Sequence, residues 1–219
     1  MPPGFAVIDV WLADATGPAW GGSGGVDERH PDQLTAVGRE LSAAVIGDAE
    51  HPLPCNLSHS GHLVVFAIAR SPCITHLGVD LEMRRKAPRP AAFASRILAE
   101  GEAAGATDLV AAWTIKEAAL KAVRVGLAGD PRLWRFDSLQ STTPRLLEAP
   151  GPWGPATRWA FARTDIEGPA VLAVAARLDT EQPVEVAIRS AVSPAEAARP
   201  GLSPSLCLTW SPLCRPTTS

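Results

Sequence analysis

The chain has 219 residues, of which 46% are hydrophobic and 20% are charged, and its formal net charge is -3 at pH 7. This composition is ordinary for a folded globular protein and excludes a collagen-like or a wholly disordered chain. A small negative charge gives no long-range attraction for nucleic acid or for an anionic membrane, so we expect neither as a partner.

The sequence predicts a cytoplasmic protein. Its first residues lack a basic leader and are interrupted by Asp9, which is a poor match to a signal peptide. No apolar run approaches the roughly 18 residues that a bilayer-spanning helix needs. The cysteines are far apart and form no CxxC pair, so we expect plain thiols rather than a zinc ribbon or a disulfide framework.

The first predicted elements are a strand, a helix and a second strand. Residues 7–11 alternate as a strand does, and residues 31–46 repeat their apolar side chains at helical intervals. Residues 56–61 are rich in turn formers and lead into a strand over residues 63–69. This pattern places His59 in a turn at the entrance of a strand.

The polar residues around Pro72 are the best candidate boundary, because an acidic strand opens a new run of elements just beyond them. The elements expected after this boundary are a strand at residues 78–82, helices at 91–98 and 108–125, and strands at 159–162 and 171–176. From about Thr180 onward proline, serine and alanine dominate and the periodic pattern fades.

We therefore expect three parts: a short amino-terminal half (residues 1–72), a carboxy-terminal half (73–180) and a mobile tail (181–219). Residues 64–70 and 171–177 align position by position, which hints at two related halves. In an alanine-rich chain, chance also explains so short a match.

Asp80 and Glu82 are two residues apart in the predicted strand, so their carboxylates share one face while Val79 and Leu81 turn to the core. Neighbouring carboxylates repel unless a cation lies between them, and Glu117 on the later helix offers a third oxygen ligand. This combination indicates a magnesium site. The pattern also fits the polar face of a half-exposed strand, and it does not decide between the two.

The helix that carries Glu117 has one lysine out of pattern. On a helical wheel Lys116 falls within an apolar stripe formed by Leu109, Trp113, Leu120 and Val123. Glu117 and Lys121 lie four residues apart on its flank. The plain interpretation is a solvated pair worth about 0.3 to 0.5 kcal/mol, with the Lys116 ammonium reaching water.

Two other site classes fit poorly. The sequence has no GxSxG elbow, which argues against a serine hydrolase. A zinc site made by Cys55, His59, His62 and Cys73 would match no standard finger spacing.

Three segments resemble, in their order, the hallmarks of one family. They are Asn56-Leu57-Ser58-His59-Ser60, Gly78-Val79-Asp80-Leu81-Glu82 and Trp113-Thr114-Ile115-Lys116-Glu117-Ala118-Ala119-Leu120-Lys121. With these segments the chain resembles the 4'-phosphopantetheinyl transferases of the Sfp type over about residues 52–136.

The resemblance implies an α+β fold in which two similar halves are related by a pseudo-twofold axis and hold coenzyme A, the co-substrate, in the cleft between them. It implies transfer of 4'-phosphopantetheine from coenzyme A to a serine of an acyl or peptidyl carrier protein, with release of 3',5'-ADP. The carrier would serve fatty acid, polyketide or nonribosomal peptide assembly, and we expect the enzyme to be a monomer.

The resemblance also assigns roles to residues. Asp80, Glu82 and Glu117 would bind Mg²⁺, and Glu117 would accept the serine proton, directly or through a bound water. Lys121 would neutralise charge at the transferred phosphate. The residues expected to contact coenzyme A are Ser58, His59, Lys116 and Lys121.

One part of the family pattern is missing. Glu50-His51-Pro52 stands where a Gly-Lys-Pro element is expected, and no lysine precedes Lys86. Arg29 and Arg39 are the remaining candidates to hold the 3'-phosphate of coenzyme A. Two alternatives follow: an inactive relative that binds a carrier or coenzyme A, and another magnesium-dependent phosphohydrolase.

Overall fold

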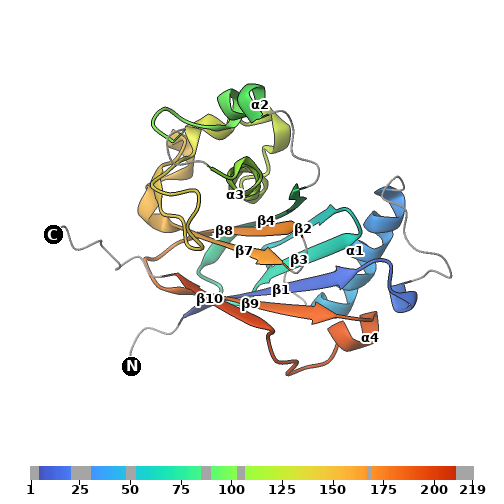
Figure 1. Cartoon of the computed structure of the whole chain (residues 1–219). Coiled ribbons are helices and arrows are strands. Elements are labelled where there is room, and N and C mark those ends of the chain that lie inside the picture. The colour runs from blue at the N-terminus through green and yellow to red at the C-terminus, as the bar shows by residue number, and fades with distance from the viewer. Residues whose placement is uncertain are drawn as a thin grey trace.

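The computed structural model describes residues 5–20, 31–47, 53–84, 90–102, 107–166 and 169–210. These residues form two main sheets, a small two-stranded sheet and several helices (Figure 1), which confirms the predicted α+β class. Among them, no helix has both the length and the apolar character needed to cross a membrane.

The first sheet has the strand order β10-β9-β1-β3-β2. Its strands are β1 (Ala6–Asp14), β2 (Cys55–Ser60), β3 (Leu63–Ala69), β9 (Val184–Ala191) and β10 (Leu206–Trp210). β3 pairs antiparallel with both β1 and β2, whereas β9 runs parallel to β1 and antiparallel to β10. The strands predicted at residues 7–11 and 63–69 are confirmed.

Helices cover the outer face of the first sheet. They are α1 (Pro31–Ile46), the short α4 (Pro194–Ala197) and a 3-10 turn, η1 (Pro18–Trp20). Leu34, Val37 and Leu41 of α1 are buried against this sheet, as the helical periodicity predicts. A Cβ atom on Gly38 would lie 2.6 Å from a methyl carbon of Leu57, so α1 sits close to β2.

The second sheet is antiparallel and has the strand order β4-β8-β7. Its strands are β4 (Ile74–Met83), β7 (Trp159–Ile166) and β8 (Ala170–Leu178), which confirms the three strands predicted in this part of the chain. One hydrophobic core joins the two sheets. It includes Val10, Leu12 and Val65 of the first sheet and Val79, Leu81 and Val174 of the second.

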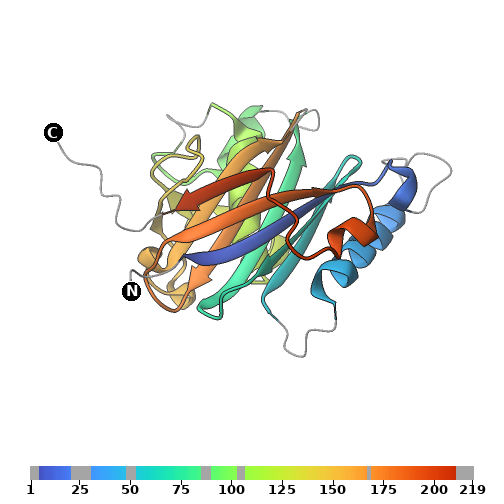
Figure 2. The same ribbon diagram turned by 90° about the horizontal axis from the view of Figure 1, so that it is seen from below.

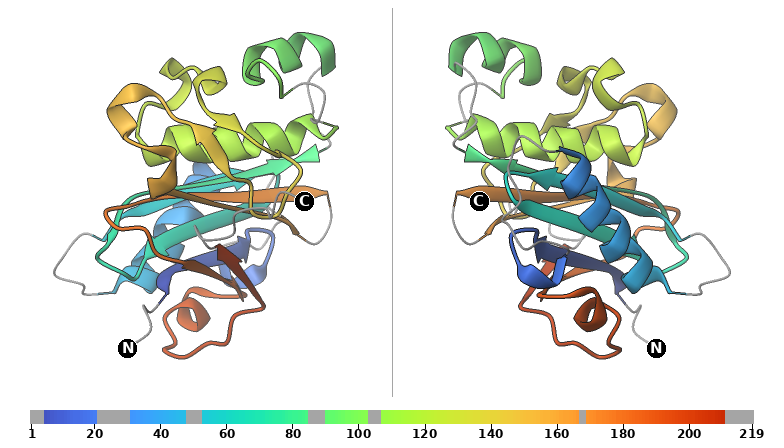
Figure 3. Two further views of the ribbon diagram at one scale, coloured as in Figure 1. Left: turned by 90° about the vertical axis from the view of Figure 1, so that its left-hand side faces the viewer. Right: turned by 90° about the vertical axis from the view of Figure 1, so that its right-hand side faces the viewer.

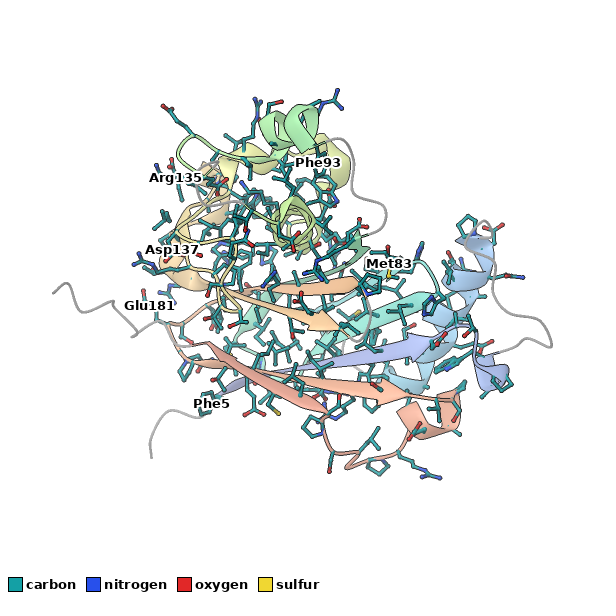
Figure 4. The ribbon with its side chains drawn as sticks, viewed as in Figure 1. Phe5, Met83, Phe93, Arg135, Asp137 and Glu181 are labelled. Carbon is teal, nitrogen blue, oxygen red and sulfur yellow. The ribbon has the colours of Figure 1, made fainter. Side chains whose placement is uncertain are left out.

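Helix α3 (Leu109–Ala122) covers the other face of the second sheet (Figure 3). Asp108 caps it, because its side chain accepts hydrogen bonds from two backbone N–H groups of the first turn. Helix α2 (Pro90–Ile97) lies beside α3, and Phe93 is labelled on it in Figure 4. Phe93 meets Trp113 of α3 edge to face, with ring centroids 5.3 Å apart. Both predicted helices are confirmed.

The remaining elements are short and surround α3. They are β5 (Arg135–Phe136), β6 (Leu146–Glu148) and the 3-10 turns η3 (Gly126–Ala128), η4 (Pro131–Leu133), η5 (Gly151–Trp153) and η6 (Ala156–Arg158).

The two sheets share one order of connection. In the first, β1 is followed by α1, β2 and β3. In the second, β4 is followed by α3, β7 and β8, with α2 inserted before α3 and the short β5 and β6 inserted after it. In each series the last strand named, β3 or β8, lies between the other two strands of that series and pairs antiparallel with each. The similar segments at residues 64–70 and 171–177 belong to these two central strands.

The expectation that regular structure ends near residue 180 is wrong. Residues after this point form β9, α4 and β10, and Figure 2 shows β9 beside β1 with β10 on its other side. The physical reason is a period-two pattern: Val184, Val186 and Ile188 alternate along β9 and are buried in the shared core. The prediction failed because it relied on the proline and serine content of the surrounding segment and not on this short alternation.

Candidate active site

β4 and α3 run antiparallel and lie unusually close together. A Cβ atom on Gly78 would lie 2.5 Å from the backbone nitrogen of Ala122 and closer still to the carbonyl oxygen of Ala118. Only glycine permits this approach. The next residues on the same face of β4, Asp80 and Glu82, therefore face the side of α3 directly.

The segment predicted to be a turn around His59 is strand β2, and this correction explains how the site is built. The side chains of Asn56 and Ser60 accept hydrogen bonds from the backbone N–H groups of Val79 (3.0 Å) and Met83 (3.1 Å). Ser58 lies between them on the same face. Side chains two residues apart thus attach β2 to the edge of β4, and the polar residues that suggested a turn serve this attachment.

Asp80 is at the centre of the cluster and is only 3% exposed. Its Oδ1 accepts hydrogen bonds from the Lys121 ammonium at 2.5 Å and from the Ser58 hydroxyl at 3.0 Å. The Lys121 ammonium also lies 2.7 Å from the Ser58 hydroxyl oxygen. Burial raises the pKa of Asp80, and Lys121 and Ser58 oppose that rise.

Glu82 lies one step further along β4. Its carboxylate accepts hydrogen bonds from the Trp113 indole nitrogen (3.3 Å) and from the Ser60 hydroxyl (3.4 Å). Burial and then the negative charge of Asp80 raise its pKa.

Glu117 reaches the same cluster from α3 and is 7% exposed. Burial, followed by the charge of Asp80, raises its pKa to about 7. Trp113, Glu117 and Lys121 are spaced by four residues, so they form one stripe on α3 that faces β4. Because its pKa is about 7, Glu117 gains or loses a proton near neutral pH.

The donor chemistry of this cluster fits a hard divalent cation, although its side chains are not gathered around one point. Asp80 Oδ2 and Glu117 Oε1 are buried and have no hydrogen-bond partner among the described residues. Oxygen atoms of this kind are the ligands that Mg²⁺ prefers. However, no three His, Cys, Asp or Glu side chains in the described ranges are grouped closely enough to hold one metal ion. Lys121 supplies the positive charge beside Asp80 instead.

Lys116 does not join the cluster. Its side chain has no exposed surface, and its ammonium donates to Glu102 Oε2 at 2.6 Å and to the Pro131 carbonyl at 3.2 Å. Position 116 is turned by about 100° from position 117 on the helix, so Lys116 points into the core beside Phe136. Both expectations for this residue, contact with the nucleotide and contact with water, are corrected by this placement.

Glu102 is a partner that the sequence reasoning missed. Its carboxylate also accepts hydrogen bonds from the backbone N–H groups of Ala99 (2.6 Å) and Phe136 (2.8 Å). The signal that could have revealed it is the lysine out of pattern on α3, because a buried ammonium requires a carboxylate nearby.

The other expected coenzyme A contacts are spread out. His59 is half-buried, and strand alternation places it on the face of β2 opposite Ser58. Arg39 is exposed on α1, and Arg29 lies outside the described residues. The structure thus brings together Ser58, Asp80, Glu82, Glu117 and Lys121 and leaves His59, Lys116 and Arg39 elsewhere.

The matched part of the chain contains most of this cluster. Residues 76–175 match the family model of the 4'-phosphopantetheinyl transferase superfamily. The matched residues run from β4 to β8 and include Asp80, Glu82, Glu117 and Lys121, whereas Ser58 precedes them. No curated protein matches the chain. Over this part the chain is similar to transferases of the phosphopantetheinyl type.

Proposed function

We propose that this protein transfers 4'-phosphopantetheine from coenzyme A to a serine of an acyl or peptidyl carrier protein, releases 3',5'-ADP and depends on Mg²⁺. One observation carries the proposal. Three carboxylates with raised pKa values and one lysine, all within the residues that match the superfamily, lie together where β4 and α3 pack beside β2.

Lys121 is the residue that would meet the phosphates of coenzyme A. Its side chain is 27% exposed although its ammonium contacts the buried Asp80, so it reaches from the cluster to the surface. Phosphoryl transfer depends mainly on positioning and on neutralising charge at the phosphate oxygens, which an ammonium group at this place provides. The Ser58 hydroxyl accepts a hydrogen bond from this ammonium and donates one to Asp80, so it fixes the two groups relative to each other.

Glu117 is the group that would accept the serine proton. A general base works best when its pKa lies near the operating pH, and the pKa of Glu117 is raised to about 7 in the metal-free protein. In the proposed step the serine oxygen bonds to the phosphorus that carries pantetheine. The bond from that phosphorus to the bridging oxygen breaks, 3',5'-ADP leaves, and Glu117 takes the proton.

Asp80, Glu82 and Glu117 are the proposed ligands of Mg²⁺, which would supply positive charge at the pyrophosphate. Binding requires the three side chains to turn toward one point. Asp80 Oδ2 and Glu117 Oε1 have no hydrogen-bond partner among the described residues and are available as ligands, whereas the ion would have to replace a hydrogen bond at Glu82, both of whose oxygens are acceptors.

We also propose the Sfp-type arrangement of two related halves, with coenzyme A between them. It is supported by the shared order of connection and by the similar segments in β3 and β8. In both halves the aligned residue of the central strand, Phe66 or Ala173, lies opposite a residue of the first strand, Trp11 or Asp80. The cytoplasmic location and the monomeric state stay predictions from the sequence.

The test is product release by the purified protein with coenzyme A, Mg²⁺ and an apo carrier protein, followed by liquid chromatography. We expect 3',5'-ADP to appear only with the carrier, and not with a carrier whose acceptor serine is replaced by alanine. Release of phosphate from nucleotides without a carrier would instead indicate a phosphohydrolase. Carrier binding without release would indicate an inactive relative.

A further inference from the structure

A cavity of about 180 Å³ lies on the outer face of the first sheet. It is lined by residues of β1, β9 and α1, by Arg70 at the end of β3, and by the chain that leads from α4 toward β10. Figures 1 and 3 show α4 and α3 on opposite sides of the molecule. The cavity is therefore separate from the carboxylate cluster beside α3, and none of its lining residues belongs to that cluster.

The charged side chains of the cavity are one carboxylate and three guanidinium groups: Asp9, Arg70, Arg189 and Arg199. Arg70 Nε donates to Asp9 Oδ2 at 2.8 Å, and Arg189 donates to Asp9 Oδ1. Arg199 is exposed and forms no ion pair with any described residue. One carboxylate is thus shared by two arginines while a third arginine keeps its charge, so the lining carries two more positive than negative charges.

Arg189 is held firmly in the cavity wall. Its Nε donates to the Leu202 carbonyl at 2.8 Å, and its guanidinium carbon lies 5.5 Å from the centre of the Trp11 ring. Its side chain is only 17% exposed. A guanidinium fixed by these contacts and by Asp9 loses little conformational freedom when an anion binds to it.

The rest of the lining is mostly apolar. Ala44 and Val45 of α1 contribute to it, and so do Pro200 and Leu202 after α4. Ligand sites commonly combine an apolar wall with a few placed polar groups. An anion without a hydrocarbon part would use only the arginines, whereas an anion with one would also cover the apolar wall.

We propose that this cavity binds a small organic carboxylate, with the carboxylate group on the arginines and the hydrocarbon part against the apolar wall. An arginine fork matches the two oxygens of a carboxylate. The N–H groups of Arg199, and those of Arg70 other than Nε, have no acceptor among the described residues. A cavity of about 150 Å³ is large enough for benzene, whose six non-hydrogen atoms equal those of butanoate.

The bound carboxylate would also join the chain after α4 to α1 and β1, because all three line the cavity. A ligand that binds only the folded state stabilises it by mass action. Butanoate should therefore raise the unfolding temperature of the full chain.

The test is a titration of the ¹⁵N-labelled full chain with butanoate, followed by the indole N–H resonance of Trp11, which lines the cavity. Loss of one signal in Trp11→Phe assigns this resonance. The wild type should show a saturable shift with butanoate, and acetate should bind about tenfold more weakly because it lacks two methylene groups. Butanamide, which has the same size and no charge, should give no shift at the same concentrations.

Arg199→Gln should fold as the wild type does, because its side chain contacts no described partner, and should bind butanoate about tenfold or more weakly. Arg96→Gln is the matched control, since Arg96 is exposed on α2 and should leave the affinity unchanged. The inference is overturned if butanoate gives no saturable shift, if butanamide binds equally, or if the two variants behave alike. Inorganic phosphate binding as tightly as butanoate would overturn the assignment to a carboxylate with a hydrocarbon part.

Discussion

The three carboxylates of the cluster lower the stability of the metal-free fold, because they are buried without enough positive charge around them. Asp80, Glu82 and Glu117 all have raised pKa values, and burial is the largest cause for each. Without a bound cation the folded protein therefore resists charging these groups, which is typical of carboxylates whose chemistry matters more than their packing.

Glu117→Gln should stabilise the metal-free protein above pH 7. The pKa of Glu117 is about 7 in the fold and 4.5 in the reference state, so the folded protein binds the proton more tightly and its stability falls as pH rises from about 4.5 through 7. At about 1.4 kcal/mol per tenfold change, this loss is on the order of 3 kcal/mol. Urea unfolding in a chelating buffer at pH 5 and pH 8 measures it.

Glu148→Gln is the matched control, because Glu148 is exposed on β6 and should give the same unfolding free energy as the wild type at both pH values. If Glu117→Gln is less stable than the wild type at pH 8, then the ionised Glu117 side chain does not destabilise the fold, and the prediction is contradicted. Transfer activity should be lost in Glu117→Gln and kept in Glu148→Gln.

At the scale of elements, the periodicities predicted which segments are helices and which are strands, but not how β2 is used. Asn56, Ser58 and Ser60 are turn formers by type, but backbone pairing with β3 makes them strand residues, and their side chains attach β2 to β4. That attachment is a contact between distant segments, so local propensity could not predict it. The shared face of Asp80 and Glu82 was predictable from spacing within one strand. The role of Lys121 was implied only by the family resemblance, because spacing alone favoured a solvated pair with Glu117.

The contact between β4 and α3 should not tolerate a methyl group. In Gly78→Ala the new Cβ would clash with backbone atoms of Ala118 and Ala122, which cannot turn aside as a side chain can. We expect a loss of about 1 to 3 kcal/mol in unfolding free energy, as overpacking typically gives. Because α3 must shift, transfer should fall more than stability alone explains.

Gly151→Ala serves as the comparison, since nothing lies within 4 Å of a Cβ atom at Gly151. The unfolding temperature and the transfer rate are measured for both variants, and both values should be lower for Gly78→Ala. A Gly78→Ala variant as stable and as active as Gly151→Ala would show that the close approach is unnecessary.

At the scale of the whole molecule, the carboxy-terminal segment belongs to the first sheet. β9 runs parallel to β1 over eight paired positions, from Ala6 and Val184 to Ala13 and Ala191. A parallel partner so distant in sequence leaves no local signal beyond a short alternation, which explains why the composition was misleading.

A chain ending at residue 180 should therefore fail to fold. It would expose β1 as an edge and remove Val184, Val186 and Ile188 from the core between the sheets. A chain ending at residue 210 keeps every described element and should unfold as the full chain does. Circular dichroism and analytical gel filtration distinguish the two outcomes, and a folded, active chain ending at residue 180 would contradict the assigned role of β9.

The claim on which the account depends is that the Asp80 cluster performs phosphopantetheine transfer. Asp80→Asn keeps the shape of the side chain and its contact with Ser58 but removes the charge beside Lys121. The most direct measurement is the intact mass of an apo carrier protein after incubation with coenzyme A, Mg²⁺ and either enzyme. We expect the carrier to gain one phosphopantetheine group with the wild type and none with a folded Asp80→Asn variant. An unchanged carrier mass with the wild type, or equal modification by both enzymes, would contradict it.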